Sequence, residues 1–196
     1  MLKKAFLAIV VLFVVATVVF CIVVSMQPAD FKISRSATMA ATPEKVFAQV
    51  NDFHNWDAWS PWAKIDPTMK AEFSGAAAGV GAVYSWAGTG DAGEGEMTIA
   101  ASHPSEHIGI DIEFLKPMAA KNTIDFMFKP EGDKTNVMWT MAGKNNFAAK
   151  AFCMFVNMDK LVGGDFEKGL AQMKMVVESG PKPAPVASPD PAANAK

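Results

Sequence analysis

Three of the five tryptophans in this chain lie within seven residues, at Trp56, Trp59 and Trp62, and Pro61 stands just before the last. Each indole buries a large apolar area when it finds a partner, so such a cluster is costly to leave in water. A spacing of three places the rings near one face of a helix, but Pro61 prevents a regular helix from continuing through them. The stretch 52–62 therefore predicts a short, bent, largely buried helical segment, which the rest of the chain must cover with a concave surface.

The first 26 residues differ sharply from the rest of the chain. From Ala5 to Met26 there are 22 residues without a charge, which as a helix would extend about 33 Å against a hydrocarbon core of about 30 Å. A cleaved signal peptide, the main alternative, has an apolar region of only about 7 to 15 residues. We predict a transmembrane signal anchor over residues 1–26, crossing the membrane through residues 5–26. Because Lys3 and Lys4 precede the span, the positive-inside bias predicts a periplasmic or other extracytoplasmic domain.

Residues 27–179 have the length of one domain, and residues 180–196 are a Pro/Ala-rich tail with little to bury, predicted to be disordered. The domain carries 14 Lys and Arg against 19 Asp and Glu, a net charge of −5, and Arg35 is its one arginine. This balance argues against a nucleic-acid partner, because such proteins present basic patches. The two cysteines, Cys21 and Cys153, provide neither a disulfide framework nor a metal knuckle.

Alternation of apolar and polar residues predicts a series of strands. Ile108, Ile110 and Ile112 share one face of such a strand, while Asp111 and Glu113 share the other. Short connections rich in Gly and Pro separate the segments, so we expect an antiparallel meander with one wet face. The predicted strands are 31–40, 70–74, 82–86, 96–101, 107–115, 122–129 and 135–141.

Helical periodicity frames these strands. The run Thr42-Pro43-Glu44 is typical of a helix start, with a hydroxyl cap and Pro at the first position. Near the end of the chain the period of 3.6 returns. One stripe of Phe147, Ala151, Met154, Phe155, Met158 and Val162 is expected to end at Gly163-Gly164, and Asp165 to open a last helix with Phe166, Leu170, Met173 and Val177 on one side. We therefore predict an α+β helix-grip, a curved antiparallel sheet wrapped around a long C-terminal helix, behind an N-terminal transmembrane helix.

Several segments resemble the START-like (SRPBCC) superfamily, in its polyketide cyclase/dehydrase-type branch. The resemblance covers roughly residues 31–178. The segments that carry it are Thr42-Pro43-Glu44-Lys45-Val46-Phe47, the run from Asp52 through Trp56 to Trp59-Ser60-Pro61-Trp62, Gly79-Val80-Gly81-Ala82 before Trp86, and Asp165-Phe166-Glu167-Lys168-Gly169-Leu170. It implies a deep cavity between sheet and C-terminal helix that takes hydrophobic ligands. Because this fold hosts many functions, it does not identify an activity.

We accordingly expect membrane-anchored binding or transport of a hydrophobic, lipid-like small molecule, without cofactor or metal. Each large apolar residue on the inner face is also suited to fill the core, so the argument for a cavity is collective. The adaptable side chain of methionine suits a surface that accepts varied apolar ligands. The candidate ligand-binding residues are Trp86, Ile112, Phe114, Phe126, Trp139, Phe155, Phe166, Leu170 and Met173.

Two other functions stay open at this point. A cyclase- or hydrolase-type enzyme would need acid/base groups inside the cavity, for which Tyr84 and Arg35 are the available candidates. A protein-interaction module would use the proline-containing tail as its docking element. The runs Gly88–Gly93 and His103–His107 match dinucleotide and zinc motifs in letters, but each falls in a turn between strands, where neither mechanism operates.

Overall fold

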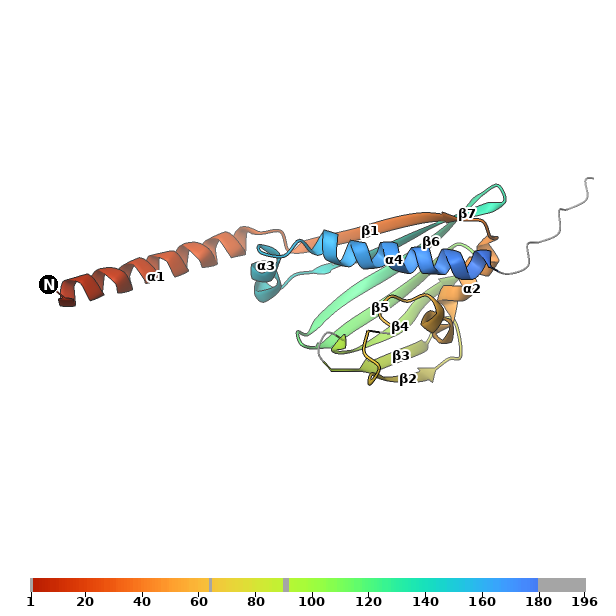
Figure 1. The fold of residues 1–196 in the computed structure, drawn as a ribbon, viewed down its shortest axis with the longest axis horizontal. Coiled ribbons are helices and arrows are strands. Elements are labelled where there is room, and N and C mark those ends of the chain that lie inside the picture. Colours follow the sequence, from red (N-terminus) through yellow and green to blue (C-terminus); the bar gives the residue numbers. More distant parts are fainter. Residues whose placement is uncertain (1, 64, 90–91, 180–196) are drawn as a thin grey trace, which may run out of the picture.

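The computed structural model describes residues 2–63, 65–89 and 92–179, and the predicted tail lies outside them. Its centre is a seven-stranded antiparallel sheet in the order β1-β7-β6-β5-β4-β3-β2, so chain order is broken only where β1 joins β7 (Figure 1). The strands are β1 Asp30–Met39, β2 Lys70–Gly75, β3 Ala82–Ala87, β4 Glu94–His103, β5 His107–Lys116, β6 Ala120–Glu131 and β7 Lys134–Lys144. The predicted meander is confirmed, and most strands are longer than the alternation indicated.

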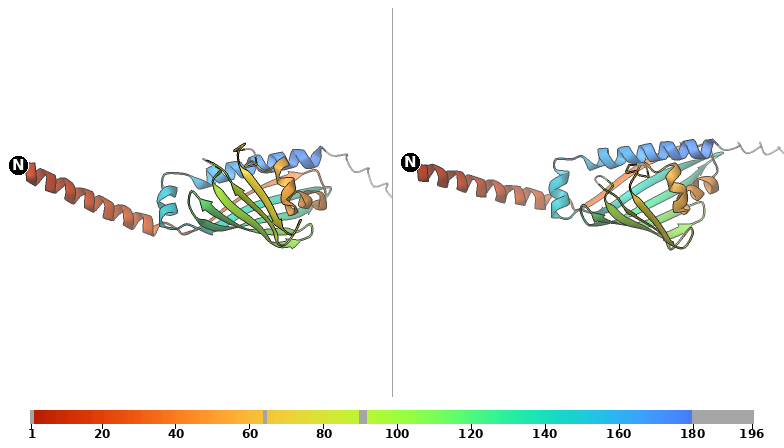
Figure 2. Two further views of the ribbon diagram at one scale, coloured as in Figure 1. Left: turned by 90° about the horizontal axis from the view of Figure 1, so that it is seen from below. Right: turned by 60° about the horizontal axis from the view of Figure 1, so that its bottom comes forward.

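Helices surround the inner face of this sheet. The long helix α4 contacts β1 and extends across the concave side, while α2 lies near its far end (Figure 2). This is the predicted α+β helix-grip. The helices are α1 Leu2–Met26, α2 Pro43–Asn51, the 3-10 helix η1 Phe53–Ala58, α3 Phe147–Cys153 and α4 Met158–Glu178.

The tryptophan stretch forms a short helical segment, as its sequence predicts. Asp52 caps η1 by accepting a hydrogen bond from the backbone N–H of His54 at 2.9 Å. Trp56 and Trp59 are buried, and their indole N–H groups donate to the backbone oxygens of Val50 and Gln49. The segment therefore returns onto the end of α2 and directs both rings toward the sheet.

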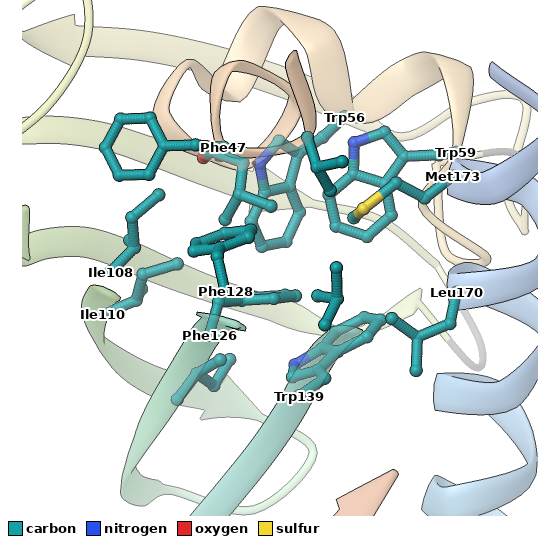
Figure 3. Close-up of a cluster of buried hydrophobic side chains, with 14 of the residues drawn as sticks. Phe47, Trp56, Trp59, Ile108, Ile110, Phe126, Phe128, Trp139, Leu170 and Met173 are labelled. Atoms are coloured by element: carbon teal, nitrogen blue, oxygen red, sulfur yellow. Dashed lines mark hydrogen bonds between the residues drawn. The ribbon is translucent and has the colours of Figure 1, made fainter. Parts of the chain in front are cut away.

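Figure 3 shows these two rings in a cluster with Trp139 of the sheet and with Leu170 and Met173 of the last helix. Trp139 of β7 lies parallel to Phe166 of α4, with ring centroids 4.1 Å apart, and Trp59 packs edge-on to Trp139 at 5.6 Å. Gly169 makes this approach possible, because a Cβ there would lie 2.8 Å from the Trp139 ring and 3.0 Å from Pro61. The tryptophan stretch is thus buried against the sheet in a packed aromatic core.

The predicted helix break at Gly163-Gly164 is wrong. Helix α4 runs without interruption from Met158 to Glu178, and the break lies earlier, after Cys153. The side chain of Asn157 supplies a new N-cap by accepting from Lys160 N at 2.9 Å. Gly163 serves packing instead, because a Cβ at this position would collide with the guanidinium of Arg35. This close contact offsets the helix-propensity cost of a glycine, about 1 kcal/mol.

Replacing Trp59 by alanine should lower the free energy of unfolding by about 3 to 5 kcal/mol, because the fully buried ring leaves a cavity inside the aromatic stack. Urea-induced unfolding of the full chain in detergent, followed by far-UV circular dichroism, measures this change. The exposed Met138, beside Trp139 on the same strand, is the control, and Met138→Ala should change stability by less than about 1 kcal/mol. Equal effects of the two substitutions would contradict the packing described.

Candidate functional site

The centre of the inner face is filled by side chains. Five of the predicted ligand-binding residues come together there from β6, β7 and α4, and each is at most 1% exposed. They lie between the sheet and α4, where the family resemblance implied a deep cavity. These residues are Phe126, Trp139, Phe166, Leu170 and Met173.

The end of the inner face nearest α1 is less tightly covered. Trp86 of β3 and Phe114 of β5 are both half-buried, with ring centroids 6.0 Å apart, and Ile112 lies buried beside them. Gly95 of β4 lies beneath Trp86, where a Cβ would collide with the indole. Four half-buried apolar residues that the sequence did not assign to the site continue this surface: Phe31, Trp62, Met158 and Val162. We call this set of half-buried side chains, together with Trp86 and Phe114, the open end.

The structure places Phe155 apart from the other predicted site residues. It is 78% exposed and lies in the connection between α3 and α4, away from the packed core. The prediction followed one helical stripe through Phe147, Met154 and Phe155, but the helix ends at Cys153 and restarts at Met158. All three side chains are exposed.

Two polar groups on the inner face have no partner among the described residues. Trp139 Nε1 is fully buried without a hydrogen bond, whereas the indole N–H groups of Trp56, Trp59 and Trp86 all donate to backbone oxygens. The amide of Asn122, half-buried on β6, makes no side-chain hydrogen bond within the described part of the chain and lies over Gly143. The indole N–H of Trp139 is enclosed by packed side chains, whereas the half-buried amide of Asn122 is within reach of a polar atom of a bound molecule.

All N–H donors of the Arg35 guanidinium form hydrogen bonds within the protein. Its five N–H donors meet Glu167 Oε1, both carboxylate oxygens of Asp159, and the backbone oxygens of Ser34 and Asp159, at 2.7 to 3.1 Å. The hydrogen bonds with Asp159 and Glu167 raise the pKa of the guanidinium, and the bond to Asp159 lowers the pKa of that carboxyl. Arg35 therefore joins β1 to α4 and has no donor left for a substrate.

Tyr84, the other polar candidate, lies among rings. Its neighbours are Phe53, Phe73 and Trp86, at centroid distances of 6.0, 5.3 and 6.0 Å. Burial raises the pKa of the Tyr84 hydroxyl, and the negative charge of Asp57 raises it further. At neutral pH the hydroxyl is therefore protonated and suited to donate a hydrogen bond, while removal of its proton is disfavoured.

The outer face of the sheet carries a groove that sequence reasoning missed. It has a volume of about 780 Å³ and lies over β4 to β7 and the start of β1. Most of its lining residues face outward, but Phe31, Ile112 and Asn122 of the inner face also border it. Its walls are charged, with Glu113 paired to Lys121 at 2.9 Å. The alternation that placed Asp111 and Glu113 on one face indicated a wet surface, but only the curvature of the sheet makes that surface concave. No group of three or more metal-ligating side chains occurs within residues 2–63, 65–89 and 92–179.

Asp66 holds the rim of the open end. Its carboxylate accepts hydrogen bonds from the backbone and hydroxyl of Thr68, and from the same groups of Thr89 after β3, at 2.7 to 3.1 Å. These bonds, the Thr68 hydroxyl first, lower the pKa of Asp66 from 3.8 to about 2. One ionised side chain thus ties the connection after Trp62 to the loop after Trp86.

Comparison with known proteins supports the fold. The family model described as "Polyketide cyclase / dehydrase and lipid transport" matches residues 30–178. A crystal structure of protein CV1439 from Chromobacterium violaceum is similar at 14% identity and a TM-score of 0.57, covering 76% of this chain and 98% of that one. The Aha1 dimer from Colwellia psychrerythraea is similar at 17% identity and a TM-score of 0.55, with the same two coverages. No curated protein matches the sequence.

The pKa of Asp66 predicts a pH dependence. Because the folded value lies below the ordinary one, the carboxylate stabilises the fold fully above pH 3.8, and this contribution is lost as the pH falls through about 2. The wild-type chain should therefore lose more stability between pH 5 and pH 2 than Asp66→Ala does, as measured by urea midpoints. Asp133→Ala, in the exposed β6–β7 turn, is the control and should behave like the wild type. Parallel losses in wild type and Asp66→Ala would contradict this role.

Proposed function

Because this chain belongs to the polyketide cyclase / dehydrase and lipid transport family, we propose that it binds a hydrophobic, lipid-like small molecule at the open end of its inner face. The observation that carries the proposal is that the apolar core continues beyond the fully buried stack into half-buried rings, Trp86 and Phe114 among them. Covering a large aromatic side chain fully stabilises a complex by about 1.5 to 3 kcal/mol. An apolar ligand placed here would remove several such surfaces from water.

The polar groups of the site fit an amphipathic ligand. Asn122 lies on β6 close to Ile112 and Phe31, so its amide is available to a polar group of a molecule whose chain contacts those side chains. A fatty acyl chain with one or two acceptor oxygens has the required combination, since apolar sites gain orientation from a few placed polar groups.

We further propose that α1 anchors this domain in a membrane. The helix Lys3–Met26 is long and apolar enough to cross a bilayer, although a signal sequence shares these properties. Its side chains are exposed almost throughout, so the folded domain does not bury them. Lys3 and Lys4 at its start favour a cytoplasmic N-terminus and an extracytoplasmic domain. Binding would then take place beside the membrane that holds the ligand.

A photoreactive fatty acid tests the proposed binding. Full-length protein in lipid nanodiscs is irradiated with a diazirine-bearing palmitic acid, and labelled peptides are identified by mass spectrometry. We expect adducts on peptides of β3 and β5 that contain Trp86 and Phe114, in addition to those on α1. Phe114→Ser should reduce the labelling affinity about tenfold, because the loss of one aromatic contact is worth about 1.4 kcal/mol or more.

The matched control is Asp111→Asn, three residues earlier on the outer face of the same strand. This change should leave labelling at the inner face unaltered. Adducts confined to α1, or equal effects of both substitutions, would contradict binding at the open end. Adducts near Lys121 and Thr98 would instead assign the ligand to the outer groove.

A further inference from the structure

Helix α3 exposes apolar side chains that nothing in the described chain covers. It contains no buried residue, although two of its seven residues are phenylalanine. Phe152 is 47% exposed and Phe155, in the connection after the helix, is 78% exposed. Monomeric soluble proteins rarely present such side chains in a group. We define the α3 patch as the exposed residues Phe147, Phe152, Met154, Phe155 and Leu161.

The structure fixes the α3 patch beside the end of α1. Asn145 N donates to Ala29 O at 2.8 Å, so the chain entering α3 is hydrogen-bonded to the chain leaving α1. Lys150, in the middle of α3, places its Nζ 3.4 Å from Ser25 O in the last turn of α1. α1 contacts α3, and near that end Val24 is fully buried. Figures 1 and 2 show α3 at the junction of α1 and β1, the end of the domain nearest α1.

This position corresponds to the membrane–water boundary. If the apolar run of α1 fills a hydrocarbon core of about 30 Å, its last turn lies where the chain leaves the lipid. Aromatic and apolar side chains with few charges are stable at this depth. Between Asn145 and Met158 the one charged residue is Lys150, whose cation suits a headgroup region.

We infer that the α3 patch rests in the bilayer interface as a second membrane contact beside α1. The inference depends on the proposed membrane span, and it names the lipid surface as the partner of this patch. We assign the bilayer as the partner of the α3 patch because the patch adjoins α1 and lies at the level of the last turn of α1. A second membrane contact would prevent the domain from rotating freely about the end of α1.

Two membrane contacts would fix the orientation of the domain, and therefore the direction in which the open end faces. Phe31 is the second residue of β1, at the α1 side, and Met158 and Val162 belong to the first two turns of α4, which also carry Leu161 of the α3 patch. With the patch in the interface, these half-buried residues face the layer of lipid headgroups. An apolar ligand would then pass between bilayer and inner face without crossing bulk water.

Depth-dependent fluorescence quenching in full-length protein tests the inference. The probe is an environment-sensitive NBD label on a single introduced cysteine, in a Cys21→Ser, Cys153→Ser background, reconstituted in phosphatidylcholine/phosphatidylglycerol vesicles. The three positions are Phe155→Cys in the patch, Asp133→Cys in the distant β6–β7 turn, and Phe13→Cys in the middle of α1. We expect blue-shifted emission at positions 155 and 13, with position 155 quenched most by lipids spin-labelled near the headgroup, and aqueous emission at position 133.

The possible results separate the two proposals. Quenching at position 13 with aqueous emission at position 155 would overturn the second contact and leave the membrane span intact. Aqueous emission at position 13 would overturn the span, and the contact with it. A blue shift at position 155 without quenching by lipid would show that protein covers the patch, and would also overturn the inference. Ligand binding at the open end is measured independently by photolabelling.

Discussion

The parallel stacking of Trp139 on Phe166 is the contact on which the rest of the structure depends. It brings the middle of α4 onto β7 at a distance that only Gly169 allows, and it provides the surface against which Trp59 and Trp62 pack. The tryptophan stretch could not be buried without it, because a 3-10 helix of six residues has little stability of its own. One pair of rings thus joins the sheet, the last helix and the connection after α2.

Different interactions position the two halves of α4. Its C-terminal half buries Leu170, Met173 and Val177 in the core, while its N-terminal half is positioned by the ion pairs of Arg35 with Asp159 and Glu167. Exposed ion pairs contribute little free energy, typically about 0 to 1 kcal/mol, but they fix direction. Apolar packing beneath the first turns is less complete, because Met158 and Val162 there are half-buried, whereas Phe166 and the inward-facing residues after it are fully buried. The inner face is accordingly closed around the middle and end of α4 and less tightly covered at its start.

The sequence predicted the strands, the helix-grip and the bent segment around Trp56. Apolar periodicity and the Gly and Pro residues that end each segment act locally, so they can be recognised without the tertiary structure. It misplaced the break in the last helices because the role of Gly163 is set by Arg35, more than a hundred residues away. The helical stripe that took in Phe155 also ran past the N-cap Asn157, because apolar periodicity alone does not register a cap. Phe126 and Trp139 could either line a cavity or fill the core, depending on the curvature of the sheet and its distance from α4. The alternation of apolar and polar residues indicates neither quantity.

Only Gln27, Pro28 and Ala29 separate α1 from β1, a reach of about 10 Å when fully extended. With α1 in a membrane, as proposed, a domain tethered so closely could not act as a shuttle across an aqueous compartment, because its travel would be shorter than its own diameter. Any cargo destined for another compartment would have to be collected by a second, diffusible carrier or by a protein docked alongside. The short linker would make such an anchored domain a stationary relay, with its capacity set by the number of copies in the membrane.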